Sequence, residues 1–152
     1  MYRQAIRALL VIGGVTIGGQ STDFTMNDHA CLRYEPDTVA ITGILVRKTF
    51  PGPPNYESIA KGDKPETGFY LELARPICTV ASADSEINQS VSGVHLVQLV
   101  LDQAGYDRLR PGLGHVINVR GKLFAEFTAH HHAPLLLDVI FPPDRARGLT
   151  RA

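Results

Sequence analysis

Three consecutive histidines, His130, His131 and His132, are the most conspicuous chemistry-bearing residues of this 152-residue chain. In an extended segment successive side chains point to opposite faces, so His130 and His132 share one face and His131 takes the other. Two imidazoles on one face can ligate zinc or copper, but a tight site needs a third or fourth ligand from elsewhere in the chain. The alternative is a structural role, in which the histidines hydrogen-bond backbone groups of the turn before Pro134.

A second unusual segment, residues 50–66, contains four prolines and two glycines. This composition predicts an exposed, ordered loop without regular secondary structure, stiffened by its prolines. Loops held by a rigid scaffold often carry binding residues. The predicted ligand-binding residues are therefore the polar and aromatic side chains of this loop and one histidine of the turn: Asn55, Tyr56, Glu57, Asp63 and His131. The alternative is a solvated loop without a function.

Several common signatures of enzymes and of nucleic-acid-binding proteins are missing from the chain. We find no Gly-x-Ser-x-Gly, no His-Glu-x-x-His and no glycine-rich phosphate loop, so we expect no catalytic residues. Basic and acidic side chains balance at 15 each and the basic ones are dispersed, which argues against a nucleic-acid partner.

Residues 1–21 have the three-part pattern of a secretory signal peptide. Arg3 and Arg7 give a basic start, residues 8–17 are largely apolar, and small residues follow at Gly18 and Gly19. Because the apolar run is shorter than the ~20 residues needed to cross a bilayer, cleavage is favoured over a permanent anchor. We therefore expect a periplasmic or secreted protein that is not integrated in the membrane once processed.

Export changes how the two cysteines, Cys31 and Cys78, are interpreted. In an oxidising compartment an isolated pair of thiols is most simply a disulfide. A catalytic thiol and metal ligation are weaker alternatives, because neither cysteine lies in a Cys-x-x-Cys context. Closing this loop stabilises a fold by ~4 kcal/mol on the chain-entropy model.

The remaining pattern is mainly β. Alternating apolar residues predict strands, and one short stretch before a Pro-Gly pair predicts a helix. The predicted strands cover residues 39–49, 69–74 with a resumption after Pro76, 94–101, 114–123 and 135–141, and the helix covers residues 102–110. This order is that of a small five-stranded OB-like barrel with one short helix between its third and fourth strands. The predicted domain is residues 31–142, followed by a flexible tail at residues 143–152.

Several motifs carry a resemblance to a known family: Cys-Leu-Arg-Tyr-Glu-Pro from Cys31, Phe-Pro-Gly-Pro-Pro-Asn-Tyr-Glu-Ser from Phe50, Gly-Lys-Leu-Phe from Gly121 and His-His-His-Ala-Pro-Leu-Leu from His130. Together they resemble an exported bacterial domain family of unknown function, over roughly residues 31–139. The resemblance implies envelope biology, because the domain is sometimes joined to small modules that resemble lysozyme inhibitors. It implies no role for any single residue.

In OB-type barrels the loops after the first and fourth strands border the ligand surface. Here those loops are the proline-rich segment and the histidine turn, so both are predicted at one edge of the barrel. The sequence therefore predicts a non-catalytic binding or inhibitory accessory protein of the bacterial cell envelope, without a cofactor. Its partner would be an envelope protein or a small ligand. The competing hypothesis is a periplasmic zinc- or copper-binding protein that uses His130 and His132.

Overall fold

The computed structural model describes residues 31–142, so the predicted signal peptide and C-terminal tail lie outside the described residues. The described chain is mainly β, and none of its helices is long and apolar enough to cross a membrane. Its elements in order are β1 (Leu32–Arg33), β2 (Thr38–Pro51), η1 (Ile59–Lys61), β3 (Pro65–Ile77), β4 (Thr79–Val80), β5 (Val94–Val100), α1 (Gln103–Leu109), η2 (Arg110–Gly112), β6 (Val116–Ala125) and β7 (Leu135–Val139).

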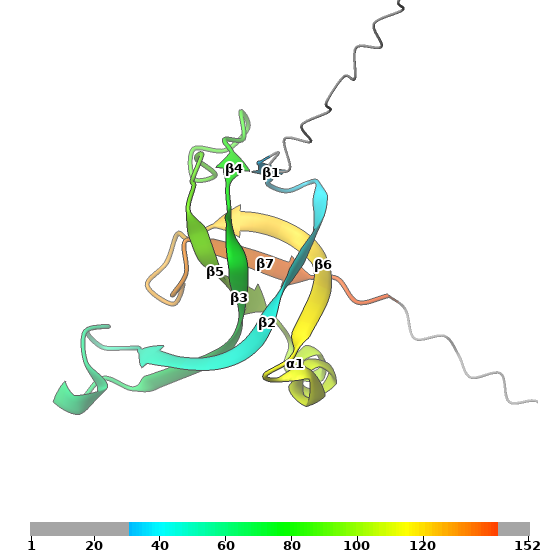
Figure 1. The fold of residues 1–152 in the computed structure, drawn as a ribbon. Coiled ribbons are helices and arrows are strands. Elements are labelled where there is room, and N and C mark those ends of the chain that lie inside the picture. The colour runs from blue at the N-terminus through cyan, green and yellow to red at the C-terminus, as the bar shows by residue number, and fades with distance from the viewer. Residues whose placement is uncertain (1–30, 143–152) are drawn as a thin grey trace, which may run out of the picture.

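Five strands close into a barrel in the order β2-β3-β5-β7-β6 (Figure 1). β2 pairs with both β3 and β6 in antiparallel fashion, and β5 pairs with β7 in parallel. Helix α1 joins β5 to β6 and lies at one end of the barrel (Figure 1). The predicted mainly β, OB-like architecture with one short helix is therefore confirmed.

The apolar side chains of the alternating pattern fill the interior of the barrel. Leu45, Leu71, Val97 and Leu123 are fully buried in one cluster, together with Leu135 and Leu137 of β7. Each such side chain removed from water contributes roughly 1.5–3 kcal/mol. Tyr70, Ala133 and Leu136 are also buried, but they are not members of this interior cluster.

Gly43 lies where β2 changes partner. Residues 38–44 pair with β6 and residues 44–51 pair with β3. A Cβ atom at Gly43 would lie 2.8 Å from the carbonyl oxygen of Glu72, so only glycine lets the two strands approach this closely. Barrel closure thus depends on a residue without a side chain at position 43.

Beyond the barrel, β2 and β3 continue as a projecting hairpin, which we call the arm and define as residues 47–69 (Figure 1). The prediction that residues 50–66 lack regular structure was wrong at both ends. β2 runs to Pro51 and β3 begins at Pro65, and these two prolines face each other in the last pair of the ladder. Proline is tolerated there because its missing N–H is not needed where pairing ends.

The opposite end of the barrel carries the disulfide. Cys31 and Cys78 are bonded, as predicted, beside the short parallel pair β1 and β4. β3 continues through Pro76 to Ile77, although an interruption was predicted, because the proline falls where the register to β5 shifts. β7 ends at Val139, two residues before the predicted bound.

Candidate functional site

The histidine turn, residues 128–132, meets the arm at Glu66 of β3. Glu66 Oε1 lies 2.6 Å from Nδ1 of His130, and Glu66 Oε2 lies 2.9 Å from Nε2 of His132. The hydroxyl of Tyr56, near the tip of the arm, lies 3.1 Å from Nε2 of His130. The Glu66 carboxylate therefore contacts both imidazoles, and the imidazole of His130 also contacts Tyr56. We call Tyr56, Glu66, His130 and His132 the histidine bridge.

Gln98 of β5 anchors the backbone of the same turn. The N–H of His132 donates to Gln98 Oε1 over 2.7 Å, and Gln98 Nε2 donates to the carbonyl of His130 over 3.3 Å. A side-chain amide can satisfy both backbone groups because it carries a donor and an acceptor. The turn is thereby fixed to the barrel wall as well as to the arm.

Aromatic side chains support the bridge from below. The ring of Phe50 stacks on the ring of His132, with centroids 4.8 Å apart and planes at 7°. Phe50 also packs against Tyr70, which is 1% exposed although it lies outside the interior cluster. Burial raises the pKa of Tyr70 to about 12, so this phenol stays neutral beneath the site.

A glycine makes room for the carboxylate. A Cβ atom at Gly52 would lie 2.5 Å from Cγ of Glu66, closer than two non-bonded carbon atoms can approach. Gly52 also pairs with Lys64, since its N–H donates to the Lys64 carbonyl over 2.7 Å. The proline-rich sequence thus places a small residue where Glu66 must pass.

Asp63 organises the tip of the arm from inside. It is 4% exposed, and its carboxylate accepts hydrogen bonds from the backbone N–H groups of Asn55, Glu57 and Ser58 over 2.8–2.9 Å. The bonds from Ser58 and Asn55 lower its pKa, against the opposing effect of burial. The same bonds flank Tyr56, whose φ of 58° lies in the left-handed region that a tyrosine rarely adopts.

The charge on Glu66 is maintained by its partners. Burial would raise the pKa of this carboxyl, but the hydrogen bonds from His132 and His130 and their positive charge outweigh it, so the pKa lies below the ordinary value. An ionised carboxylate only accepts hydrogen bonds, so His130 Nδ1 and His132 Nε2 carry the hydrogens. In the neutral form of His130, Nε2 is then free to accept from the Tyr56 hydroxyl.

His131 points away from the bridge. Its Nδ1 accepts from the N–H of Phe127 over 3.1 Å, and its ring lies edge-on to Phe127 and Phe124. Burial lowers the pKa of His131, so it is neutral at physiological pH. The side chain of His131 thus faces the opposite side of the turn from those of His130 and His132, as predicted. This orientation results from the turn geometry together with the aromatic contact.

Residues 96–141 match the family model described as a domain of unknown function, DUF4431. This segment matches an uncharacterised family. The predicted resemblance to a family of unknown function is therefore confirmed, and the matched region contains Gln98 and the histidine turn but not the arm. No curated protein and no solved structure matches the chain.

The predicted ligand-binding residues fall into three groups. Asn55 and Glu57 are exposed at the tip of the arm, whereas Tyr56 is half-buried against His130. Asp63 was expected on the loop surface, but its carboxylate is used within the loop. His131 lies on the opposite side of the turn from the bridge.

The two predicted metal ligands, His130 and His132, do converge, and they converge on Glu66. Within residues 31–142 no group of three or more His, Cys, Asp or Glu side chains is placed to hold a metal ion. Ring nitrogens of both histidines are engaged by the carboxylate, so a metal would have to replace those hydrogen bonds.

Sequence reasoning did not foresee the parts played by Phe50, Glu66 and Gln98. Gln98 gave a usable signal, because a polar amide in the apolar run of β5 needs a hydrogen-bonding partner. Phe50 and Glu66 gave none, because their roles depend on the strand register of the arm.

The tip also carries Ser58 and Lys61 at the Ser-x-x-Lys spacing that some acyl-transfer enzymes use. Lys61 is exposed on the single turn η1, and among the described hydrogen bonds none joins the Ser58 hydroxyl to the Lys61 ammonium. A nucleophile needs its base within hydrogen-bond reach, and the structure does not show that contact for this pair.

Proposed function

We propose that this protein is a non-catalytic binding module of the bacterial cell envelope, whose contact surface for a protein partner is formed by the tip of the arm and the histidine turn. The observation that carries this proposal is the histidine bridge. It ties two loops that are distant in sequence into one surface through contacts of 2.6–3.1 Å.

A tied surface suits binding because ordering a loop costs affinity. Each immobilised side chain costs about 0.5–1.5 kcal/mol on association, and a loop that is already fixed avoids much of that cost. Here the prolines, the Asp63 hydrogen bonds and the bridge fix the loop before any partner arrives. The surface is preorganised on a rigid barrel, as binding loops usually are.

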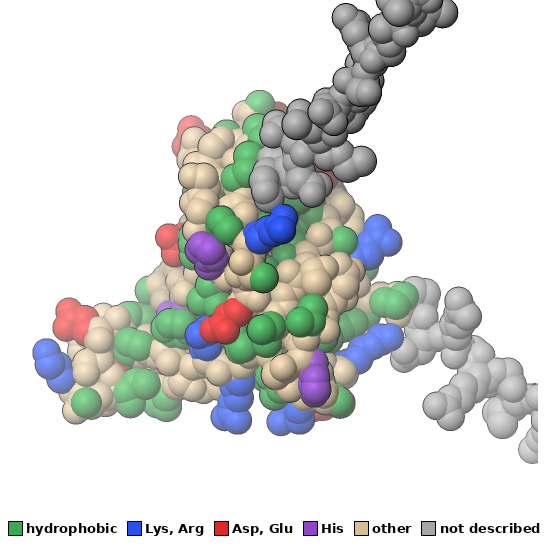
Figure 2. Space-filling model, in the orientation of Figure 1, with side chains coloured by type: hydrophobic (Ala, Val, Ile, Leu, Met, Phe, Trp, Pro, Cys, Tyr) green, Lys and Arg blue, Asp and Glu red, His purple; other side chains and the backbone are tan. Residues whose placement is uncertain are grey.

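The shape of the tip favours a protein over a small molecule. Small-molecule sites are concave, whereas the arm projects from the barrel and shows charged and hydrophobic side chains together at its end (Figure 2). Ile59 is 44% exposed there, beside the exposed Glu57 and Lys61. An apolar anchor within a polar rim is the usual composition of a protein contact.

An extracytoplasmic location supports the same proposal. The disulfide Cys31–Cys78 is the kind of bond that persists in an oxidising compartment and is rare in the cytosol. A protein there meets envelope proteins first, and a projecting rigid loop is suited to entering a cleft on one of them. Inhibition of that partner would follow if the cleft is its active site.

The direct test is site-specific photo-crosslinking in the native host. A photoreactive residue at position 57 should give one discrete protein adduct, and that adduct should disappear with Ile59→Ser. The matched control is Val80→Ser, an exposed apolar residue on β4 at the opposite end, which should leave the adduct unchanged. Equal adduct yields from both variants would rule out the tip as the contact surface.

A second candidate, zinc or copper binding, is favoured by one observation: His130 and His132 share a single carboxylate. Imidazole and carboxylate groups are donor types that zinc accepts, but within residues 31–142 these three are not placed to hold an ion as they stand, so a metal would have to displace the hydrogen bonds to Glu66. Titration with Zn²⁺ or Cu²⁺ by calorimetry decides between the candidates. Stoichiometric binding at micromolar or tighter affinity that is lost in His130→Ala and His132→Ala, but kept in His131→Ala, would establish the metal function instead.

A further inference from the structure

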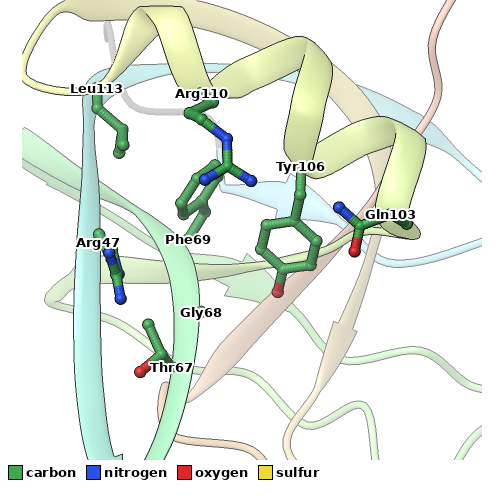
Figure 3. Close-up of a pocket in the computed structure, with 8 residues that line it drawn as sticks. All are labelled: Arg47, Thr67, Gly68, Phe69, Gln103, Tyr106, Arg110 and Leu113. Carbon is green, nitrogen blue, oxygen red and sulfur yellow. The ribbon is translucent and has the colours of Figure 1, made fainter.

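A pocket of about 290 Å³ lies between the arm and the helical segment α1–η2 (Figure 3). It is on the other face of the arm from the histidine bridge and shares no residue with it. Arg47, Thr67, Gly68 and Phe69 line it from the hairpin, and Gln103, Tyr106, Arg110 and Leu113 line it from the helical side.

The position of Arg47 follows from strand alternation. Ile41, Gly43 and Leu45 of β2 face the barrel interior, so Arg47 continues that face beyond the end of the barrel. Its partner in register is Phe69, whose ring meets the ring of Tyr106 edge-on at 4.9 Å. The face that is apolar inside the barrel therefore becomes cationic where it leaves the barrel.

The charge of this pocket is unbalanced. Two guanidinium groups and no carboxylate line it. Arg47 has no ion pair or hydrogen-bonding partner among the side chains of residues 31–142. Arg110 contacts one oxygen of Asp107 over 3.2 Å, and Gln103 donates to that same oxygen over 3.1 Å, but Asp107 itself is not among the residues that line the pocket.

The remaining lining residues divide into polar and apolar sets. Thr67 shares a hydrogen bond of 2.8 Å with Thr49, and the Tyr106 hydroxyl and the Gln103 amide add further polar groups. Phe69 and Leu113 supply an apolar wall. Lys and Arg side chains also gather along the lower edge of the molecule between the arm and α1 (Figure 2).

We propose that this pocket binds a small organic anion, with its carboxylate or phosphate group between Arg47 and Arg110 and its apolar body against Phe69 and Tyr106. Guanidinium groups bind these head groups through paired hydrogen bonds, and two of them facing one space neutralise an anion better than either alone. A volume of about 290 Å³ is at the small end of ligand sites, which restricts the ligand to one head group and one ring or short chain.

The experiment is an NMR titration of the ¹⁵N-labelled full chain with phenyl phosphate, benzoate and the neutral analogue benzamide. Either anion should give saturable shifts confined to residue 47 and to residues 67–69 and 103–113, with a dissociation constant of about 1 mM or below, whereas benzamide should not. Saturation by only one anion identifies the head group. Inorganic phosphate should bind more weakly than phenyl phosphate, because it lacks the apolar body.

Two variants make the result specific. Arg47→Gln should weaken anion binding at least about tenfold. Arg75→Gln, which changes an exposed arginine elsewhere on β3, should leave anion binding unchanged. The amide spectrum of Arg47→Gln shows directly whether the fold is kept, and Arg47→Lys should bind with intermediate affinity. The proposal is overturned by shifts that do not saturate at about 10 mM anion, or by equal affinities in Arg47→Gln and Arg75→Gln.

Discussion

The two faces of the arm use their polar residues in opposite ways. On the outer face, Glu66 is engaged by two histidines, and a third contact runs on to Tyr56. On the inner face, Arg47 points into an open pocket without a charged partner among the described side chains. Side chains alternate between the two faces along β2 and β3. The charged groups of the outer face are therefore paired within the chain, whereas the guanidinium group on the inner face could pair with an added anion.

The difference follows from what covers each face. The histidine turn contacts the outer face through Gln98, and the two strand residues in register with Gln98, Tyr70 and Leu136, are buried although they lie outside the barrel core. Within residues 31–142 the inner face is left partly open, and a pocket separates it from α1–η2 (Figure 3). The comparison predicts that changes under the outer face cost stability, while changes on the inner face cost ligand binding.

The largest effect should come from removing the support of the outer face. Leu136→Ala deletes a side chain that is 1% exposed, and it should lower the free energy of unfolding by about 2–5 kcal/mol. Chemical denaturation followed by circular dichroism measures this change. Leu113→Ala, at the half-buried wall of the inner pocket, is the matched control and should cost clearly less. Equal losses from both variants would remove the proposed difference between the faces.

A smaller effect should follow from crowding the carboxylate. In Gly52→Ala the added methyl group meets Cγ of Glu66, so Glu66 must move away from the histidines. We expect a loss of about 1–3 kcal/mol from overpacking. The measurement is the amide spectrum, which should change at residues 128–132 and stay the same at residues 103–113. Changes at both places would mean that the two faces are coupled through the arm.

Much of this architecture could be predicted from residue patterns because it depends on local rules. The barrel strands follow period-two alternation, the helix α1 ends at Leu109 shortly before Pro111 and Gly112, and prolines lie at the end of the arm. For the histidine bridge, the sequence predicted only that the proline-rich segment and the histidine turn lie at one edge of the barrel. Its central residue, Glu66, and its anchor, Gln98, depend on which strands pair and in which register, and register is a long-range property.

The inner pocket was not predicted for a related reason. Arg47 looks like an ordinary exposed residue of an amphipathic strand, and Arg110 looks like the end of a short helix. Only the extension of β2 and β3 past the barrel end brings them to one space. The burial of Tyr70 was also not predicted, because alternation assigns Tyr70 to the solvent face and does not show that Phe50 packs against it.

Acid should weaken the outer face selectively. Glu66 and Asp63 both have pKa values below their ordinary values of 4.5 and 3.8. The unfolded chain therefore takes up these protons first, so their contribution to stability is complete above about pH 4.5 and is lost as the pH falls through the lowered pKa values. Unfolding curves from pH 7 to pH 3 measure this loss, and Glu66→Gln should flatten it. An unchanged slope in Glu66→Gln would contradict a charged bridge.

The smallest effect on stability should come from the inner face itself. Arg47 is exposed and has no partner whose loss would leave a buried group unsatisfied, so Arg47→Ala should change the free energy of unfolding by no more than about 0.5 kcal/mol. The same variant should nevertheless lose the binding of phenyl phosphate or benzoate, because Arg47 supplies one of the two guanidinium groups proposed to bind the anion. Denaturation curves without ligand and with about 10 mM anion separate the two quantities, since a bound ligand stabilises only the protein that binds it. A large loss of stability without ligand would show that Arg47 supports the fold, and the two faces of the arm would then differ in composition but not in role.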